Sequence, residues 1–347
     1  MSIRSLPFWF LSRWPNCALA LCLSLAAFSL SAADLRVGMI GLDTSHTVAF
    51  AKVLNNPDDP NYVPGAVITA AYRSGSPDMP EKSMARVPGY AKELSEKYNV
   101  KLYDSIEELL KNVDVVMIEN VDGRKHLEIA RVVFPTGKPV FIDKPLAGTL
   151  AEGMEIAELA KKHNVPFFSA SSLRYSGDIV PFTKEKGKLV HTLITHSPCE
   201  LEPHHPDLFW YGVHGVEMLY TVFGTGCKTV SRATSNEGDV VTGMWADGRI
   251  GTFIGYRQAR AGYGYKAILK EGVINEEVKA NYVPMLKVIV QFFQTQKPPV
   301  SVDEMLEVLA FMEAADESKR QGGKPVSVAD VMNAHRQKLA TTRGTSK

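Results

Sequence analysis

The chain of 347 residues is 45% hydrophobic and 22% charged, and its formal net charge is +1. This length and composition are typical of a globular protein of two domains with sizeable cores. A net charge near zero, without a stripe of lysine and arginine, excludes the electrostatic pattern of nucleic-acid-binding proteins, so no nucleic-acid partner is expected.

The first 33 residues predict a secretory signal peptide. Arg4 and Arg13 are its only charges, and the apolar run of residues 17–30 leads to small residues that end at Ala33. The run is shorter than the ~20 residues of a membrane span, and no arginine pair precedes it. We therefore expect a Sec-type signal, cleavage near Ala33, a periplasmic or extracellular protein, and no stable membrane span after cleavage.

Four cysteines are present, and two of them, Cys17 and Cys22, leave with the signal. An oxidising compartment would permit the other two, Cys199 and Cys227, to pair. Two separate buried thiols fit the sequence equally well, so both alternatives stay open.

From residue 35 onward, predicted strands and helices alternate with short connections. The predicted strands cover residues 35–41, 66–72, 113–118, 140–142 and 166–169. The predicted helices run to about residue 55, over 91–98, from 105, over 124–133 and over 149–163. Such alternation predicts a parallel sheet with right-handed crossovers. Residues 74–87 break the rhythm as a loop longer than the sheet needs, and such loops are usually functional or disordered.

After residue 172 the pattern changes to strands joined by turns, followed by helices. Strands are predicted at residues 189–201, 229–235, 240–245, 251–256 and 266–270, and helices at 277–295 and 303–321. This order favours a second, α+β domain with a large, mostly antiparallel open sheet. We therefore assign an α/β fold: a Rossmann-type dinucleotide-binding domain at 34–170, an α+β substrate and oligomerisation domain at 171–325, and a C-terminal segment with a polar tail at 326–347.

The first strand-to-helix turn stands where a dinucleotide-binding domain places G-x-G-x-x-G. Gly41 provides the first glycine, but Asp43 stands at the second position and His46 at the third. An aspartate there adds bulk and negative charge where the backbone should approach a pyrophosphate. Thr44, Ser45 and the helix amides could still hold a phosphate or carboxylate, and Asp43 could serve as the helix N-cap.

The second strand ends in Arg73 and Ser74 rather than in an acid. Arginine and serine at this position suit a 2′-phosphate, so NADP would be favoured over NAD if a dinucleotide binds. The alternative is an exposed arginine at a strand end.

A later apolar strand ends abruptly in Asp143, Lys144 and Pro145. A lysine at the carboxyl end of a buried strand is costly unless an anionic or reactive group lies opposite, and ligands of open α/β sheets bind at this edge. The alternative is a lysine that caps the strand and points into water.

Several segments together resemble the Gfo/Idh/MocA oxidoreductases, the glucose–fructose oxidoreductase and inositol dehydrogenase group. The similar segments are the E-K-P-like Asp143-Lys144-Pro145, the helix start His126-Leu127-Glu128, Ser172-Leu173-Arg174-Tyr175, and Val213-His214-Gly215-Val216-Glu217. The resemblance extends from about residue 35 to residue 324.

The resemblance implies NAD or NADP, tightly bound in an exported protein, with Lys144 beside the nicotinamide and His214 as the acid/base. It also implies a homo-oligomer. The cofactor contacts that we predict are Gly41, Asp43, Thr44, Ser45, His46, Arg73, Ser74, Asn120, His126, Lys144 and Arg174.

The chain also departs from the family pattern. Besides the degraded glycine motif, Glu119-Asn120-Val121-Asp122 replaces a T-P-N-like turn and puts two acids where a cofactor would pass. Trp210 stands where the family has an acid four residues before the active-site histidine.

A histidine-rich stretch, residues 200–211, lies just before His214. We interpret it as a loop of the substrate pocket, since His204, His205, Trp210 and Tyr211 are suited to sugar contacts. A plain structural role and a metal site at His204 and His205 are the alternatives, because the residue types but not the spacing match metal ligands.

The leading functional prediction is an NAD(P)-dependent oxidoreductase acting on a sugar, polyol or derivative. One alternative is a glycoside hydrolase or lyase that recycles bound NAD. The other is a non-catalytic carbohydrate-binding protein that has lost the dinucleotide.

Overall fold

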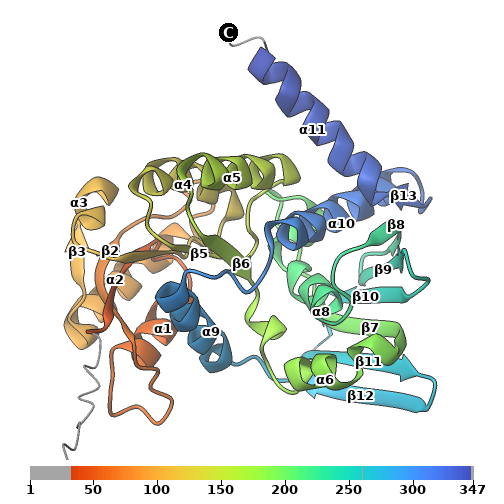
Figure 1. Ribbon diagram of the computed structural model, residues 1–347, viewed down its shortest axis with the longest axis horizontal. Coiled ribbons are helices and arrows are strands. Elements are labelled where there is room, and N and C mark those ends of the chain that lie inside the picture. The colour runs from red at the N-terminus through yellow and green to blue at the C-terminus, as the bar shows by residue number, and fades with distance from the viewer. Residues whose placement is uncertain (1–32, 260, 345–347) are drawn as a thin grey trace, which may run out of the picture. The chain divides into compact units, whose positions relative to one another are not determined.

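The computed structural model describes residues 33–259 and 261–344. Its helices and strands build two sheets, one from each half of the chain (Figure 1). The predicted signal peptide, with Cys17 and Cys22, lies outside the described residues.

The first sheet has six parallel strands in the order β3-β2-β1-β4-β5-β6. These strands are β1 (Leu35–Ile40), β2 (Ala66–Tyr72), β3 (Lys101–Tyr103), β4 (Val115–Ile118), β5 (Val140–Asp143) and β6 (Phe167–Ala170). All residues of β4 and β5 are buried, as expected of central strands covered on both faces. The strand order is that of a Rossmann fold, which confirms the predicted class of the first half.

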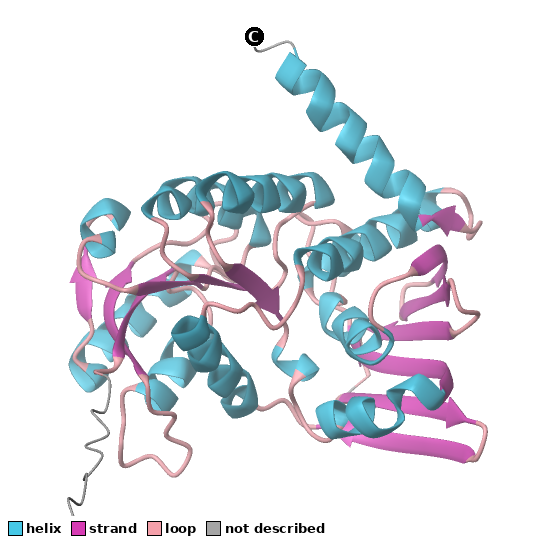
Figure 2. Ribbon diagram, in the orientation of Figure 1, coloured by secondary structure: helices cyan, strands magenta, loops and turns pink. Residues whose placement is uncertain are grey.

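Helices cover both faces of this sheet (Figures 1 and 2). One face carries α3 (Ile106–Leu110), α4 (His126–Val133) and α5 (Leu150–His163), and the other carries α1 (His46–Leu54), α2 (Val87–Tyr98) and α9 (Tyr282–Thr295). Side-chain N-caps begin α3 and α5, since the hydroxyls of Ser105 and Thr149 accept hydrogen bonds from the amides of Glu108 and Glu152.

The second sheet has seven strands in the order β12-β11-β7-β10-β9-β8-β13. They are β7 (Val190–Pro198), β8 (Cys227–Thr234), β9 (Gly238–Trp245), β10 (Ile250–Tyr256), β11 (Tyr263–Leu269), β12 (Gly272–Val278) and β13 (Val326–Ser327). Only β7 and β10 pair in parallel, so the predicted, mostly antiparallel sheet is confirmed.

One face of this sheet is covered by helices. Those of the second half, in chain order, are α6 (Ile179–Lys186), α7 (Asp207–Trp210), α8 (Val213–Phe223) and α10 (Val302–Arg320). Of these, α8 packs against β7 and β10 and α10 packs against β8. Large apolar side chains remain exposed on the strands themselves, among them Val240, Met244, Ile254, Ile268 and Val273.

Some elements differ from the prediction. Residues 272–278 form strand β12, which was not predicted and which includes the first two residues of the helix expected at 277–295. They pair along β11 although three of them are acidic or amide residues. The helix begins only at Tyr282, where the Asn281 side chain accepts a hydrogen bond from the Val283 amide. In the C-terminal segment, for which no element was predicted, α11 (Val328–Gly344) follows β13 and projects away from the second sheet (Figure 1).

Helix α9 belongs to the second half by sequence but packs on the first sheet. Its Phe292 ring lies 5.0 Å from Phe168 of β6, and its Tyr282 ring lies 5.6 Å from Phe50 of α1, centroid to centroid. The chain therefore passes between the two sheets more than once.

Both described cysteines, Cys199 and Cys227, are buried free thiols, which decides between the two alternatives left open by the sequence. Among the helices of residues 33–344 that the structure describes, none combines the length and apolar character that crossing a membrane requires.

The close packing of α8 on the second sheet gives the first prediction. A Cβ on Gly215 would lie 2.2 Å from the buried Phe253 ring, whereas a Cβ on Gly89, in α2, would meet no atom within 4 Å. We expect Gly215→Ala to lower the free energy of unfolding by about 1–3 kcal/mol because it overpacks the core. Gly89→Ala should raise it by about 0.5–1 kcal/mol because it only restricts the unfolded chain. Urea denaturation of both variants checks this, and equal effects of the two substitutions would contradict it.

Candidate functional site

A cavity of about 280 Å³ lies at the carboxyl edge of the first sheet, where residues of both halves meet. The first half contributes the start of α1, the 74–87 loop and the end of β5, and the second contributes the start of α8 and residues around β11 and α9. The lining residues are Thr44, Ser45, His46, Lys82, Arg86, Val121, Lys144, Ser172, Leu173, Glu200, Trp210, Tyr211, His214, Tyr263, Ala280 and Tyr282.

The first strand-to-helix turn places Asp43 away from this cavity. Its carboxylate is fully buried and accepts hydrogen bonds from the Val121 amide at 3.0 Å and the Ser83 hydroxyl at 2.7 Å. Burial raises the pKa of Asp43 to about 6. The predicted role as helix N-cap is wrong, because Ser45 occupies that position and Asp43 instead ties the turn to the neighbouring loops.

Gly41 is required by the same turn. It has φ +95°, and a Cβ there would lie 2.6 Å from the Asn120 backbone nitrogen. The turn after β1 and the turn after β4 are therefore in direct contact.

Lys144 faces the cavity rather than water. Its exposed fraction is 7%, and Nζ lies 5.6 Å from the centroid of the Tyr211 ring. Burial lowers the pKa of Lys144, and the Asp143 charge only partly opposes this. Lys144 thus lies in the wall of a ligand-sized space at the carboxyl edge of the first sheet.

His214, the second residue of α8, lies in the opposite wall. Its Nδ1 is 2.7 Å from the Ser171 hydroxyl oxygen, and its ring lies 5.0 Å from Tyr211 and 6.0 Å from Tyr263, centroid to centroid. Burial and the Lys144 charge hold the pKa of His214 well below its usual value, so the imidazole is neutral at pH 7. When Nδ1–H donates to Ser171, Nε2 keeps a lone pair that can accept a proton.

Acidic groups collect beneath the start of α1. Asp143 Oδ2 lies 2.7 Å from His46 Nδ1, and Glu119 Oε2 lies 3.9 Å from the same nitrogen. Burial, and after it the Asp143 charge, raises the pKa of Glu119 well above its usual value. His46 itself is held by stacking on Phe50 and by an edge contact with Tyr282.

The 74–87 loop is tied down by a second buried acid, Asp122. This carboxylate accepts hydrogen bonds from Ser76, from Arg124 and from His205 Nε2, the last at 2.9 Å. Burial alone would raise the pKa of Asp122, but these three donors hold it far below the usual range. The long loop is therefore part of the wall of the site.

This network corrects two expectations for the histidine-rich stretch. The His205 side chain is fully buried in its pair with Asp122, so it lies in the scaffold and not at the cavity. His204 turns to Glu202, at 2.8 Å, and is half-exposed. The two histidines thus face different carboxylates and do not share a ligand position.

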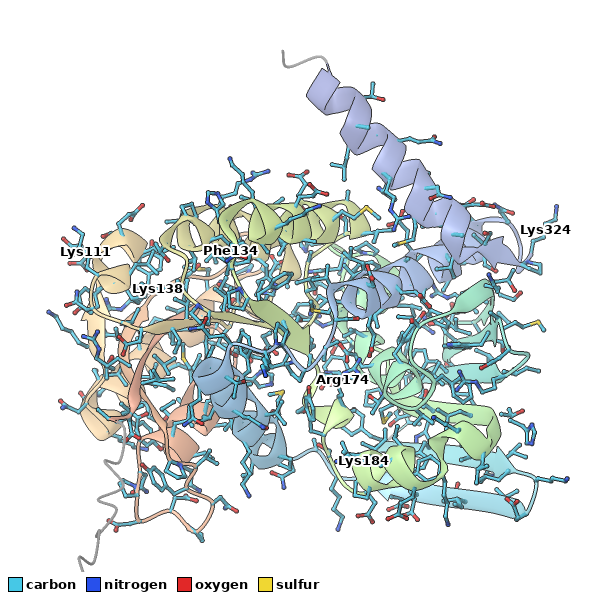
Figure 3. All side chains as sticks on the ribbon, viewed as in Figure 1. Lys111, Phe134, Lys138, Arg174, Lys184 and Lys324 are labelled. Carbon is cyan, nitrogen blue, oxygen red and sulfur yellow. The ribbon has the colours of Figure 1, made fainter. Side chains whose placement is uncertain are left out.

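Several predicted cofactor contacts also lie elsewhere. Arg73 is exposed, and the Ser74 hydroxyl accepts a hydrogen bond from the Asn120 amide group. Both ring nitrogens of the buried His126 lie near backbone carbonyls, those of Pro145, Leu146 and Asn120, so it connects two turns. Arg174 is buried between Glu217 and Glu304 at 2.7 and 2.5 Å and lies where the two halves meet (Figure 3).

The structure therefore brings together Thr44, Ser45, His46, Lys144, Trp210, Tyr211 and His214. It adds residues that the sequence interpretation missed, namely Lys82, Arg86, Ser171, Tyr263 and Tyr282. The length of the 74–87 loop was a signal for Lys82 and Arg86, but the two tyrosines follow no motif.

The resemblance implies a nicotinamide dinucleotide, and the residues present fit one end of it. Thr44 and Ser45 line the cavity at the N-terminus of α1, where the helix dipole favours a phosphate. The Asp43 charge, which we expected to oppose a pyrophosphate, is directed into the protein. A cavity of about 280 Å³ suits the nicotinamide end or a sugar-sized molecule rather than a whole dinucleotide.

Comparison with known proteins gives consistent results. Residues 35–171 match the model of the oxidoreductase family with an NAD-binding Rossmann fold, Gfo/Idh/MocA. An uncharacterized oxidoreductase of Schizosaccharomyces pombe is 32% identical over 154 residues, which are 40% of this chain and 42% of the relative. The chain thus spans about two fifths of the length of the curated relatives it matches.

Solved structures show the same fold over most of the chain. GenD2 from gentamicin A biosynthesis, in complex with NAD, has a TM-score of 0.69 at 18% identity and covers 85% of this chain and 97% of its own. Myo-inositol dehydrogenase from Lactobacillus casei, in complex with NAD(H) and myo-inositol, has a TM-score of 0.67 at 15% identity and covers 85% and 96%.

The position of Arg174 gives a prediction that tests whether this residue stabilises the fold or contacts the cofactor. Arg174→Met leaves the buried Glu217 without its cation, so we expect a loss of about 3–5 kcal/mol in the free energy of unfolding. Arg36→Met is the matched control, because its partner Asp114 is partly exposed and such surface pairs contribute about 0–1 kcal/mol. Denaturation measures both. If the folded Arg174→Met protein loses most of its affinity for the dinucleotide, then Arg174 contacts the cofactor, as the sequence analysis predicted.

Proposed function

We propose that this protein is an NAD(P)-dependent oxidoreductase, because residues 35–171 match the model of the Gfo/Idh/MocA oxidoreductase family with its NAD-binding Rossmann fold. Its substrate class is a sugar, a polyol or a derivative. The observation that carries the proposal is the convergence of Lys144 and His214 on one sugar-sized cavity beside the start of α1.

The chemistry needs an acceptor for hydride and an acceptor for the hydroxyl proton. A bound nicotinamide would supply the hydride acceptor. His214 is neutral because of its burial, so its Nε2 accepts the hydroxyl proton, and Ser171 orients the ring through Nδ1. The Lys144 cation stabilises the oxygen as negative charge develops on it.

The cavity wall supports the substrate class. Trp210, Tyr211, Tyr263 and Tyr282 surround the Lys144 and His214 side chains. Aromatic faces pack against the C–H surfaces of a sugar ring, and they exclude water from the reacting centre. The hydroxyl groups of Tyr211 and Tyr263 lie 3.4 Å apart, and each can make a further hydrogen bond to a polyol.

We further propose that the cofactor is held tightly and that the protein acts outside the cytoplasm. The signal-like residues 1–33 support export, and an exported enzyme has no nicotinamide pool for exchange. The preference for NADP over NAD rests on Arg73 at the end of β2, which is not part of the cavity lining and would contact the adenosine end of the dinucleotide. The exposed apolar residues of β9, β10, β11 and β12 support a homo-oligomer that covers them.

The first test of this function uses the protein purified from the exported fraction. Intact mass should show a chain that begins at Asp34, and absorbance and mass of the released small molecules should show NAD or NADP. Lys144→Met and His214→Asn should keep the cofactor but lower kcat by roughly 100- to 10,000-fold, because each removes a group needed only as the proton and hydride leave. Thr341→Ala, near the C-terminus and far along the chain from the cavity, is the control.

Absence of bound dinucleotide, with none bound on addition, would remove the oxidoreductase proposal. Net hydrolysis of a glycoside without a change in cofactor absorbance would favour the alternative in which bound NAD is recycled. Full turnover in Lys144→Met would remove the role proposed for that lysine.

The second test concerns the charge of His214. Because burial and Lys144 lower its pKa well below 6.5, the imidazole should stay neutral as pH falls from 8 to 6. Rates that need the neutral base should therefore keep their value over this range and fall only at lower pH. NMR titration of 13C-labelled histidines, with His214→Asn to assign the signal, measures the midpoint without a substrate. A midpoint at or above 6.5 would contradict the proposed base.

A further inference from the structure

Three side chains from three separate elements meet beneath the first turn of α1. They are His46, the first residue of α1, Glu119, which follows β4, and Asp143, which ends β5. One nitrogen or oxygen atom from each lies within 4.8 Å of the others. The meeting is a consequence of topology, because β1, β4 and β5 are parallel neighbours whose carboxyl ends share one edge.

Glu119 is the unexplained member of this group. Its exposed fraction is 0%, and neither carboxylate oxygen has a hydrogen-bond partner among the described residues. Burying a carboxyl group without hydrogen-bond partners is unfavourable, and it is more unfavourable still when the group is charged. The neighbouring Asp143 carboxylate adds repulsion. A leucine would fill this position at lower cost, so the carboxylate calls for a cationic partner.

The other two members are held in orientation from outside. The Lys144 amide donates to Asp143 Oδ1 at 2.8 Å, which directs Oδ2 toward His46. Phe50 stacks on the His46 ring at 5.3 Å, and Tyr282 meets it edge-on at 4.8 Å. Such supporting contacts around an imidazole and a carboxylate are typical of metal ligands, whose orientation must be fixed.

The three donor atoms also indicate which kind of metal ion could bind. One imidazole nitrogen and two carboxylate oxygens suit first-row divalent ions, and three protein ligands leave a coordination position for another molecule. Two ligands bound at 2.0–2.1 Å in tetrahedral geometry are roughly 3.3 Å apart. The 2.7 Å and 3.9 Å separations from His46 Nδ1 bracket this value, so small side-chain shifts suffice.

We propose that His46, Glu119 and Asp143 bind one divalent cation of the first transition row, with Zn²⁺ and Mn²⁺ as the probes, and that its open position faces the cavity. His46 lines that cavity, so a bound ion lies within reach of a hydroxyl or carboxylate oxygen of a polyol or sugar acid. The site is independent of the proposed redox function, because it is defined by metal binding alone.

The cation would also resolve the conflict in the first turn. Glu119 and Asp143 place two carboxylates beneath the α1 N-terminus, where a phosphate or other anion would bind. A divalent ion neutralises them and restores a positive potential at the helix start. Acids at this edge are then compatible with an anionic ligand instead of opposed to it.

The test is equilibrium dialysis of the mature, chelator-treated protein against Zn²⁺ and, separately, Mn²⁺, with the bound metal counted by mass spectrometry. Wild type should bind one equivalent. Glu119→Gln and Asp143→Asn should each weaken binding by about 100-fold or more, since each removes a direct ligand. His204→Ala, which changes the half-exposed histidine paired with Glu202, should leave stoichiometry and affinity unchanged.

A second measurement keeps the outcome clear if a variant folds poorly. Metal should raise the Tm of wild type and of His204→Ala but not that of Glu119→Gln, which keeps the shape of a protonated glutamate. Co²⁺ bound by wild type should show visible d–d absorption, which Glu119→Gln should lack. Absence of metal binding by wild type would overturn the proposal and leave a proton as the partner of Glu119. Binding that survives Glu119→Gln and Asp143→Asn, or that is lost in His204→Ala, would overturn it as well.

Discussion

The crowding of carboxylates at one edge of a parallel sheet is the constraint to which the rest of the site responds. Parallel pairing of β1, β4 and β5 brings Asp43, Glu119 and Asp143 to the same end of a low-dielectric layer. Each acid is satisfied in a different way. Asp43 accepts hydrogen bonds from an amide and a hydroxyl group of neighbouring loops. Asp143 pairs with His46 and accepts a hydrogen bond from the Lys144 amide. Glu119 has no hydrogen-bond partner among the described residues.

The second half of the chain supplies the histidine and most of the aromatic side chains that face the acidic edge of the first sheet. His214 and the tyrosines approach from α8 and β11, and Arg174 joins the 3₁₀ turn after β6 to α8 and α10 through Glu217 and Glu304. Burial, and after it the Lys144 charge, depresses the pKa of His214, while burial depresses the pKa of Lys144 and the Asp143 charge partly opposes this. The charge state of the base is thus set by residues of both halves, which neither sheet could provide alone.

Sequence patterns were sufficient for the architecture and for the position of Lys144 and His214. Apolar runs located β1, β2, β4, β5 and β6, and side-chain caps fixed the starts of α3 and α5, because these signals are local. Strand β12 was missed because its acidic residues pair at an open edge, where burial does not impose an apolar pattern. Helix α11 was missed because its few apolar residues, among them Val331, Met332 and Leu339, are separated by longer polar stretches.

The site residues show the same difference between local sequence signals and features that depend on tertiary packing. His205 and His126 have the residue type of ligands but serve as buried connectors, and a sequence does not show which carboxylate or carbonyl a histidine will meet. Tyr263 and Tyr282 enter the cavity only through the packing of the two sheets. Glu119 was recognised as an acid near the cofactor path, but its lack of partners is a property of the folded state.

The return of α9 to the first sheet limits how this fold can be divided. The aromatic contacts of Phe292 and Tyr282 cover apolar surface of β6 and α1, so residues 34–170 expressed alone would expose Phe168 and Phe50 to water. The two halves are therefore interlaced and are not interchangeable modules. A chimera in which the second sheet is replaced by that of another protein must keep α9 of this protein, because α9 packs on the first sheet. The junctions therefore belong on either side of that helix.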